Sequence, residues 1–343
     1  MRTIGLVAVT MGCLALAGCG GQGAGGDESG GAVKVDGSST VAPISMVAAE
    51  LYRDKKPTVQ VTVGVSGTGG GFKKFLDAQP QLRTDINDAS RPIKPTELDS
   101  ARKLGVEFVE LPIAQDGIAV VVNPKNTFVE YLTVDELKRM WEPGSKVANW
   151  KEVRDGFPDV PLKLYGPGTD SGTFDYFTEA IVGKEKASRS DFTMSEDDNV
   201  LVQGVEGDAG ALGYFGFSYY EANRDKLKLL GIGPDAAQAV KPTLDTIRGG
   251  AYRPLSRPLF LYVNTASLQR PAVAEFMSFY LEHAPEMVEH PKVNYVALTP
   301  DAYAAVRQRL TSRVTGSVMA ELKHGGPVDV AALYAVSSRP AED

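Results

Sequence analysis

The amino-acid sequence predicts an α/β protein with two lobes, each a mixed sheet flanked by helices, joined by two hinge strands. From residue 33 onward, apolar runs of strand length alternate with segments of helical periodicity, which is typical of α/β folds. Two later apolar runs, 118–123 and 259–264, resemble each other, and both end in Asn. Such a pair is expected where a chain leaves one lobe, builds the second and returns; the alternative is two unrelated core strands. The pair divides the chain into lobe 1, residues 33–116 plus 259–343, and lobe 2, residues 117–258.

The individual elements follow from hydrophobic periodicity and from capping signals. Strands are expected at 33–35, 59–65 and 85–91, besides the two similar runs. Helices are expected at 43–53, 71–78, 96–104, 133–141 and 268–283. Pro43 stands near the first turn of its helix, where a missing N–H costs nothing. Asp135 and Glu136 open another helix, where acidic side chains complement the helix dipole.

The N-terminus has the pattern of a lipoprotein signal. Arg2 precedes an apolar run, 4–17, that is too short to span a bilayer and ends in Leu-Ala-Gly-Cys19. This string predicts a signal peptide over 1–18, a lipid on Cys19 and a Gly-rich tether over 19–32. The alternative is an ordinary secretory signal with an incidental cysteine. The lipid would hold the protein in the cell envelope, on the extracytoplasmic side of the membrane.

Composition excludes several classes of function. The formal net charge is −7, with 36 basic and 43 acidic residues and no basic block, so nucleic-acid binding is not expected. The two cysteines, Cys13 and Cys19, both lie at the N-terminus, so the folded domain is expected to hold no disulfide. No pattern predicts a cofactor or a metal site. The hydrophobic content of 43% suffices for a packed core.

Three small, hydroxyl-rich turns each follow a strand-like run and open a helix-like segment. They span residues 37–40, 66–71 and 169–173. A helix N-terminus presents backbone N–H groups without intrahelical partners, and together with Ser or Thr hydroxyls these can hold a tetrahedral oxyanion. One such turn is ordinary helix capping. Three such turns in one chain indicate that all three contact the same bound anion.

The same turns do not match nucleotide-binding or hydrolase motifs. The glycines after Ser66 lack the Gly-Lys-Ser/Thr ending of a Walker loop, and the dinucleotide fingerprint is absent. Ser171 could act as a nucleophile, but it does not lie in a G-x-S-x-G string. Its partner would have to be His283, His290 or His324, all late in the chain. A serine hydrolase therefore stays a minor alternative.

Two charged residues are the best candidates for contacts beside the turns. Arg91 follows Ser90 at the end of a short strand and precedes Pro92, so its guanidinium could donate two hydrogen bonds to an anion. A solvated surface arginine is the alternative. Asp116 directly precedes the first hinge strand and is expected near the cleft. A carboxylate there would accept a hydrogen bond from the hydroxyl of hydrogen phosphate but would repel sulfate, which has no such donor at neutral pH.

Five strings in this order resemble a known family. They are Asp36-Gly-Ser-Ser-Thr-Val41, Val65-Ser-Gly-Thr-Gly-Gly-Gly-Phe72, Asn87-Asp-Ala-Ser-Arg-Pro-Ile93, Gly166-Pro-Gly-Thr-Asp-Ser-Gly-Thr-Phe174 and Gly210-Ala-Leu-Gly-Tyr214. Together with the lipid-attachment string they resemble the phosphate-binding lipoproteins of high-affinity phosphate ABC transporters, and most closely the SphX-like branch. The similarity runs from about residue 33 to residue 260, and more loosely to the end.

The resemblance implies a type II periplasmic-binding-protein fold that closes on phosphate and delivers it to a membrane permease. Residue by residue, it implies that phosphate is bound by Thr40, Val41, Thr68, Gly69, Ser171, Gly172 and Thr173. The chain departs from the best-known members at Arg91, where they have Asp, and at Pro167, where they have Arg. We therefore expect the charges to be exchanged, with Arg91 supplying the cation and Asp116, or alternatively Asp170, accepting the proton.

The sequence thus predicts a monomeric, non-catalytic phosphate receptor without cofactor, whose partners are inorganic phosphate, an ABC permease and the membrane. Ser90 and Arg91 complete the expected binding set. A receptor for another oxyanion, such as sulfate or molybdate, is the alternative with the same fold. An anchored hydrolase that uses Ser171 is the alternative from another class.

Overall fold

The computed structural model describes residues 31–169, 171–195, 197–321, 330 and 333–334. The expected signal peptide, the expected lipidation site Cys19, most of the expected tether, and Asp170 lie outside these residues. The strands are β1 Ala32–Gly37, β2 Gln60–Val65, β3 Ile86–Ala89, β4 Phe108–Val122, β5 Tyr131–Leu132, β6 Lys163–Pro167, β7 Thr193–Ser195, β8 Ala211–Gly216, β9 Lys228–Leu229, β10 Gly231–Ile232 and β11 Ser256–Asn264. The α-helices are α1 Ala42–Lys55, α2 Gly67–Phe75, α3 Pro95–Lys103, α4 Val134–Trp141, α5 Gly172–Phe177, α6 Asp198–Gly207, α7 Phe217–Ala222, α8 Leu244–Arg248, α9 Pro271–Val288 and α10 Pro300–Thr311.

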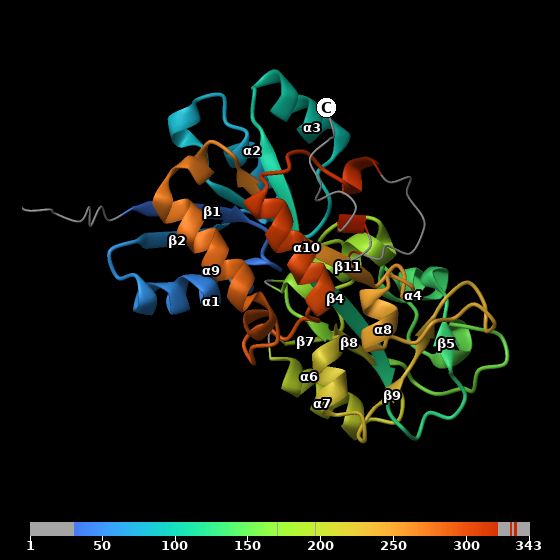
Figure 1. The fold of residues 1–343 in the computed structure, drawn as a ribbon. Helices are drawn as coiled ribbons and strands as arrows, with labels where there is room; N and C mark the ends of the chain where they lie inside the picture. Colours follow the sequence, from blue (N-terminus) through green and yellow to red (C-terminus); the bar gives the residue numbers. More distant parts are fainter. Residues whose placement is uncertain (1–30, 170, 196, 322–329, 331–332, 335–343) are drawn as a thin grey trace, which may run out of the picture.

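A mixed sheet runs through the whole molecule in the order β2-β1-β3-β11-β4-β8-β6-β7, and β9 pairs with β4. At either end of the sheet, adjacent strands are parallel. In the middle, each adjacent pair (β3 with β11, β11 with β4, and β4 with β8) is antiparallel. Helices α1 and α9 cover the part around β1 and β2, and α6 and α7 lie near β8 (Figure 1). The predicted α/β class, with a mixed sheet flanked by helices, is confirmed.

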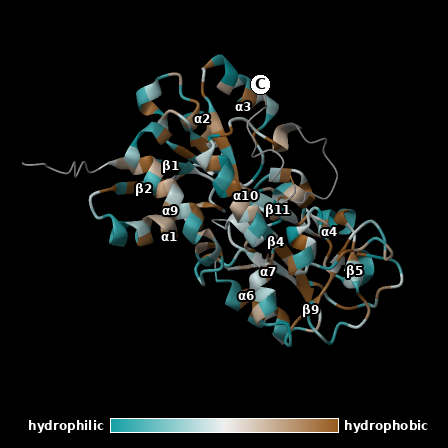
Figure 2. Ribbon diagram, viewed as in Figure 1, coloured by the Kyte–Doolittle hydropathy of each residue, from teal (hydrophilic) through white to brown (hydrophobic). Residues whose placement is uncertain are grey.

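Two separate hydrophobic cores fill the molecule. One consists of buried side chains from residues 33–114 and from 259 to the described C-terminal residues. The other consists of side chains between residues 118 and 255, together with Val296. We keep the names lobe 1 and lobe 2 for the parts around these two cores. Hydrophobic residues concentrate on central strands such as β4, and hydrophilic ones on outer helices such as α1 (Figure 2).

The strands β4 and β11 connect the lobes, and both are longer than the sequence predicted. All 15 residues of β4 are buried, because the strand passes first through the core of lobe 1 and then through that of lobe 2. Its register with β11 shifts between Leu259 and Phe260, next to Pro258 and opposite Pro112. Proline cannot donate a ladder hydrogen bond, so an irregularity here is expected.

Helix α2 begins earlier than predicted, at Gly67 instead of residue 71. Glycine is a poor helix former, so local propensity favours a turn here. The structure nevertheless gives residues 67–70 helical geometry. Gly71 lies in close contact with lobe 1, because a Cβ there would lie 2.0 Å from Oδ1 of Asn87 and 2.6 Å from the Cα of Gly37. The glycine-rich segment therefore forms the first turns of a helix that packs directly on the ends of β1 and β3.

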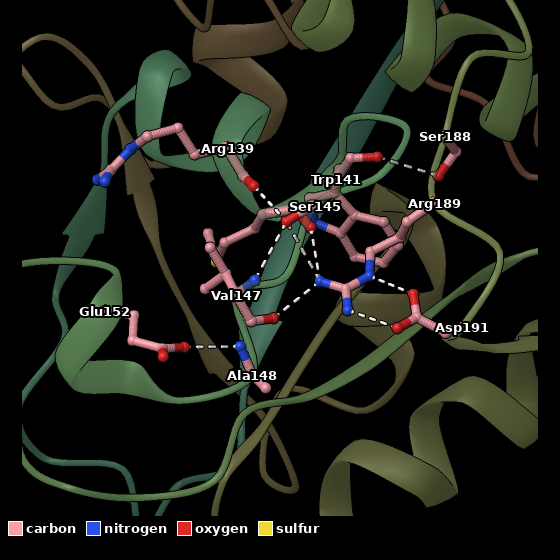
Figure 3. A network of polar contacts seen from close by, with 10 residues as sticks. Arg139, Trp141, Ser145, Val147, Ala148, Glu152, Ser188, Arg189 and Asp191 are labelled. Atoms are coloured by element: carbon pink, nitrogen blue, oxygen red, sulfur yellow. Dashed lines mark hydrogen bonds and ion pairs between the residues drawn. The ribbon is translucent and has the colours of Figure 1, made fainter.

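A buried arginine fixes the loops of lobe 2 that follow α4 (Figure 3). Nη1 of Arg189 donates to the carbonyls of Met140 at 3.1 Å and Val147 at 2.8 Å. Its Nε and Nη2 bind the carboxylate of Asp191 at 2.6 and 2.8 Å. This pairing lowers the pKa of Asp191 to about 2. The network ties the segments around Val147 and Arg189 to the end of α4.

Candidate functional site

A polar pocket of about 340 Å³ lies where the turns of lobe 1 face helix α5 of lobe 2. Its walls come from segments that are far apart in the sequence. Lobe 1 contributes Ser38, Ser39, Thr40, Ser66, Gly67, Thr68, Gly69, Gly70, Lys73, Ser90, Arg91 and Lys94; lobe 2 contributes Asp175, Glu179 and Glu185; strand β11 contributes Arg257.

The first predicted turn, before α1, touches both lobes. The backbone N–H of Thr40 donates to Oγ of Ser38 at 3.2 Å, which orders the turn. Oγ1 of Thr40 lies 3.5 Å from the carbonyl oxygen of Gly172, in the third predicted turn. A Cβ on Gly172 would lie only 2.5 Å from that hydroxyl oxygen and 2.8 Å from the Cα of Thr40. Only a glycine allows the two lobes to approach this closely.

The second predicted turn is the N-terminus of α2, and it joins the end of β3. The backbone N–H of Ser90 donates to Oγ1 of Thr68 at 3.1 Å, and the two hydroxyl oxygens are also 3.1 Å apart. The first N–H groups of α2 have no partner within the helix. Gly67, Thr68, Gly69 and Gly70 all line the pocket, so this helix end faces it. The arrangement is suited to an anion because of the free N–H groups and the positive end of the helix dipole.

The backbone of the third predicted turn contacts Thr40 of lobe 1. Ser171 is the N-cap of α5, where its hydroxyl accepts a hydrogen bond from the backbone N–H of Thr173 at 3.2 Å. Neither residue lines the pocket, and Gly172 meets lobe 1 through Thr40. Val41, the buried N-cap of α1, does not line the pocket either.

Arg91 lines the pocket, but its guanidinium is already paired. Nη1 and Nη2 donate to the two carboxylate oxygens of Glu97 at 2.9 and 2.8 Å. The guanidinium also lies over the ring of Phe72, at 5.6 Å from its centroid. This forked pairing is strong and directional. Arg91 therefore offers less positive charge to a ligand than the sequence suggested.

Asp116 occupies a different place from the one we expected. It is fully buried in β4 and does not line the pocket. Its nearest charge is Arg257, which lies opposite it in the strand register, with Nε 3.4 Å from Oδ2. Burial raises the pKa of the Asp116 carboxyl, and the guanidinium opposes this shift. Because Arg257 stands between Asp116 and the pocket, direct contact of this carboxylate with an anion stays a prediction without geometric support.

Arg257 is the functional candidate that sequence reasoning missed. It lines the pocket although only 9% of its surface is exposed. Nη2 donates to Oγ1 of Thr40 at 3.0 Å, and the guanidinium carbon lies 3.7 Å from the ring centroid of Tyr176 in α5. One side chain thus contacts lobe 1, lobe 2 and the hinge. Asp116 and Arg257 each lie two residues before one of the two similar apolar runs, but those runs do not pair with each other. Residues 259–264 pair with 108–114 instead, and only this register places Arg257 opposite Asp116.

Three carboxylates of lobe 2 face the basic residues of lobe 1 across the pocket. Glu179 and Glu185 are exposed, whereas the side chain of Asp175 is only 13% exposed. Burial raises the pKa of Asp175 to about 6.

Within the described residues, no group of three or more His, Cys, Asp or Glu side chains could hold a metal ion. None of the described helices has the length and apolar character needed to cross a membrane.

Several known proteins are similar to this chain in sequence and in fold. Residues 22–283 match the model of the PBP superfamily domain. The chain belongs to the PBP superfamily. Among its relatives there, protein SphX of Synechococcus elongatus is 47% identical over 290 residues, which are 84% of each chain. The phosphate-binding protein PstS of Staphylococcus saprophyticus is 38% identical over 299 residues, 87% of this chain and 90% of the relative.

A solved structure has a similar fold. The crystal structure of a possible phosphate-binding protein from Planctomyces limnophilus is 48% identical, with a TM-score of 0.76, and covers 82% of this chain and 97% of that chain. The resemblance inferred from the five strings is confirmed by these findings.

Proposed function

We propose that this protein is the receptor of a phosphate ABC transporter, which captures inorganic phosphate between its lobes and delivers it to a permease. The observation that carries the proposal is the pocket between the lobes. It combines the N-terminus of α2, the hydroxyls of Thr40, Thr68 and Ser90, and the buried guanidinium of Arg257. These are groups that hold a tetrahedral oxyanion. The relatives named for phosphate binding support the choice of anion.

A receptor must close around its ligand, and the contacts between the lobes are suited to closure. Thr40 of lobe 1 meets Gly172 of lobe 2, and Arg257 contacts both lobes from the hinge strand. An anion bound to Arg257 and to the turns would add contacts that exist only when the lobes are together. Closure of two lobes around a ligand is a common switching mechanism in binding proteins.

Titration calorimetry of the purified protein, after removal of bound anion, tests this proposal. We expect a single site for inorganic phosphate at micromolar or lower concentration. Absence of phosphate heat at micromolar protein would refute the receptor function. Competition with sulfate and with molybdate distinguishes a phosphate receptor from a receptor for another oxyanion.

The hydrolase alternative has no geometric support. Ser171 is engaged as a helix cap, and of the described histidines His283 pairs with Glu286 while His290 accepts a hydrogen bond from the backbone of Lys292. His324 lies outside the described residues. Relatives named as phosphate-binding proteins support a binding role rather than catalysis.

We also propose that the protein acts as a monomer on the extracytoplasmic side of the membrane, held by lipid on Cys19. The string Leu-Ala-Gly-Cys19 after a short apolar run supports the anchor. Cys19→Ser should release the protein from the membrane fraction and abolish labelling with a fatty-acid analogue. A membrane-bound, labelled variant would contradict the assignment.

A further inference from the structure

A basic surface lies at the end of lobe 1 that is opposite to the pocket between the lobes. Lys34, Arg83 and Arg270 line a hollow of about 290 Å³ there. Arg83 also lines a neighbouring groove of about 550 Å³, together with Arg313. Because the hollow and the groove share Arg83, they form one continuous surface, which we call the basic face.

The charge of the basic face is opposite in sign to that of the whole chain. Asp85 lines the hollow and pairs with Arg270, and its side chain is only 7% exposed. Glu107 lines the groove and is the other carboxylate that the described residues contribute to these walls. Four cations against two carboxylates give a local charge of +2, whereas the formal net charge of the chain is −7.

Three of the four cations have no ion pair within the described part of the chain, namely Lys34, Arg83 and Arg313. Lys34 and Arg313 are exposed. Nε of Arg83 donates to the carbonyl of Asp77 at 2.7 Å, and Nη2 of Arg313 donates to the carbonyl of Leu268 at 3.3 Å. A neutral carbonyl orients a guanidinium without cancelling its charge, so these side chains remain available to an anionic partner.

The expected lipid tether joins the folded domain at this same face. Strand β1 begins at Ala32, and Nη1 of Arg270 donates to the carbonyl of Ala32 at 2.9 Å. The 12 residues 20–31 separate this point from Cys19. A chain of this length spans at most about 40 Å when fully extended. A lipid on Cys19 would therefore keep the basic face close to the membrane.

We propose that the basic face docks on the headgroups of anionic phospholipids beside the anchor. The inference rests on the proposed lipid anchor at Cys19. Arginine and lysine bind the phosphate groups of such lipids, and each cation near an anionic membrane surface adds to the attraction. The attraction decays over a Debye length of about 8–10 Å, so it acts on a protein that a tether already holds near the surface.

Docking through this face would set the orientation of the receptor. Strands β1, β2 and β3 are parallel, and the basic face lies at the beginning of β1 and β3. Ser38, Ser66 and Ser90, which directly follow the ends of these strands, line the pocket between the lobes. The beginning of β1 also points away from lobe 2 (Figure 1). The docked protein would thus direct its pocket away from the lipid, and it would have to leave the surface to meet a permease.

A fluorescent label on the lipidated protein tests the proposal. The two cysteines are Cys13, in the expected signal peptide, and Cys19, so Gln81→Cys would supply a single free thiol on the basic face. The labelled protein is bound to vesicles of phosphatidylcholine, with or without phosphatidylglycerol, that contain a lipid with a quencher in its headgroup. Gln238→Cys, at an exposed glutamine of lobe 2, is the matched control for the label.

We expect phosphatidylglycerol to increase quenching of the label at Gln81→Cys but not at Gln238→Cys, and concentrated salt to abolish the increase. Adding Lys34→Gln and Arg313→Gln should lower the ratio of docked to undocked protein about 25-fold, about fivefold for each charge. Arg224→Gln with Lys226→Gln removes two exposed cations of lobe 2 and should leave the quenching unchanged.

The outcomes separate this inference from the functions proposed above. Equal quenching on both kinds of vesicle, or quenching that the loss of Lys34 and Arg313 does not reduce, overturns docking through the basic face. Calorimetry on the same proteins should show unchanged affinity for phosphate, so the receptor function stands or falls separately. A purified protein without lipid on Cys19 would overturn the anchor and this inference together.

Discussion

Replacing Arg257 by Met should reduce both the stability of the protein and its affinity for phosphate, and the two losses can be separated. The Arg257 side chain is 10% exposed and that of Asp116 is 1% exposed. Removal of one partner from a buried ion pair leaves an uncompensated charge and typically costs about 3–5 kcal/mol. We therefore expect the free energy of unfolding of Arg257→Met to fall by about 3 kcal/mol.

The loss of affinity has a different origin. A hydrogen bond from a charged donor to an anion contributes about 1.5–3 kcal/mol. At about 1.4 kcal/mol per factor of ten, the dissociation constant for phosphate should rise about 10- to 100-fold. Arg91→Met should have a smaller effect, because the Arg91 guanidinium is already paired with Glu97.

A double variant, Arg257→Met with Asp116→Asn, distinguishes the two effects. It removes the unpaired buried charge, so urea unfolding should show recovery of most of the lost stability. Calorimetry should show that affinity for phosphate stays low, since the guanidinium is still absent. Phosphate affinity of Arg257→Met within about threefold of the unmodified protein would refute the role of Arg257 in anion binding. A double variant no more stable than Arg257→Met would refute the assignment of the stability loss to Asp116.

Three further predictions follow from other contacts. Gly172→Ala should weaken phosphate binding at least about tenfold with little loss of stability, because the added methyl group collides with Thr40 only when the lobes meet. Calorimetry measures the affinity and urea unfolding the stability, and an unchanged affinity would contradict this prediction. Burial raises the pKa of Asp88 to about 8, so the folded protein keeps a proton that the unfolded chain releases, and stability should fall between about pH 4 and about pH 8. Asp88→Asn should remove most of that fall, which for a shift of about four pH units is of the order of 5 kcal/mol. Urea unfolding at several pH values measures it, and an equal fall in both proteins would exclude the effect. Glu110→Ala should lower the free energy of unfolding by about 3 kcal/mol, because this buried carboxylate accepts hydrogen bonds from Tyr262, Tyr334 and the backbone N–H of Val318; unfolding measurements with a change below about 1 kcal/mol would contradict it, and phosphate affinity of the folded variant should not change.

The sequence was most informative where structure depends on neighbouring residues. The hydroxyl-rich turns lie at helix N-termini because capping is a local effect. Thr40, Thr68, Gly69 and Ser90 line one pocket, and their binding of phosphate stays a prediction. The predicted start of α2 was wrong because it relied on the low helix propensity of glycine, whereas the structure includes residues 67–70 in the helix.

The charged residues were less predictable, since their positions depend on pairing between distant segments. Whether Arg91 presents a free charge depends on Glu97, which lies in the first turn of the next helix. Whether Asp116 faces the ligand depends on Arg257, 141 residues further along the chain. Periodicity indicates that a strand exists, but it does not specify the partner residue across the ladder.

The ladder between β4 and β11 places a strict limit on insertions and deletions. Asp116 and Arg257 face each other because the two strands pair in one register. Side-chain direction alternates along a strand, so adding or removing a single residue in either one would turn one partner to the opposite face of the sheet. Such a change would separate the guanidinium from the pocket while leaving every glycine and hydroxyl of the three turns in place. The lengths of β4 and β11 are therefore as necessary for ligand binding as the three turns. A variant that keeps all turns but lacks one residue of either strand should fold poorly and bind phosphate weakly.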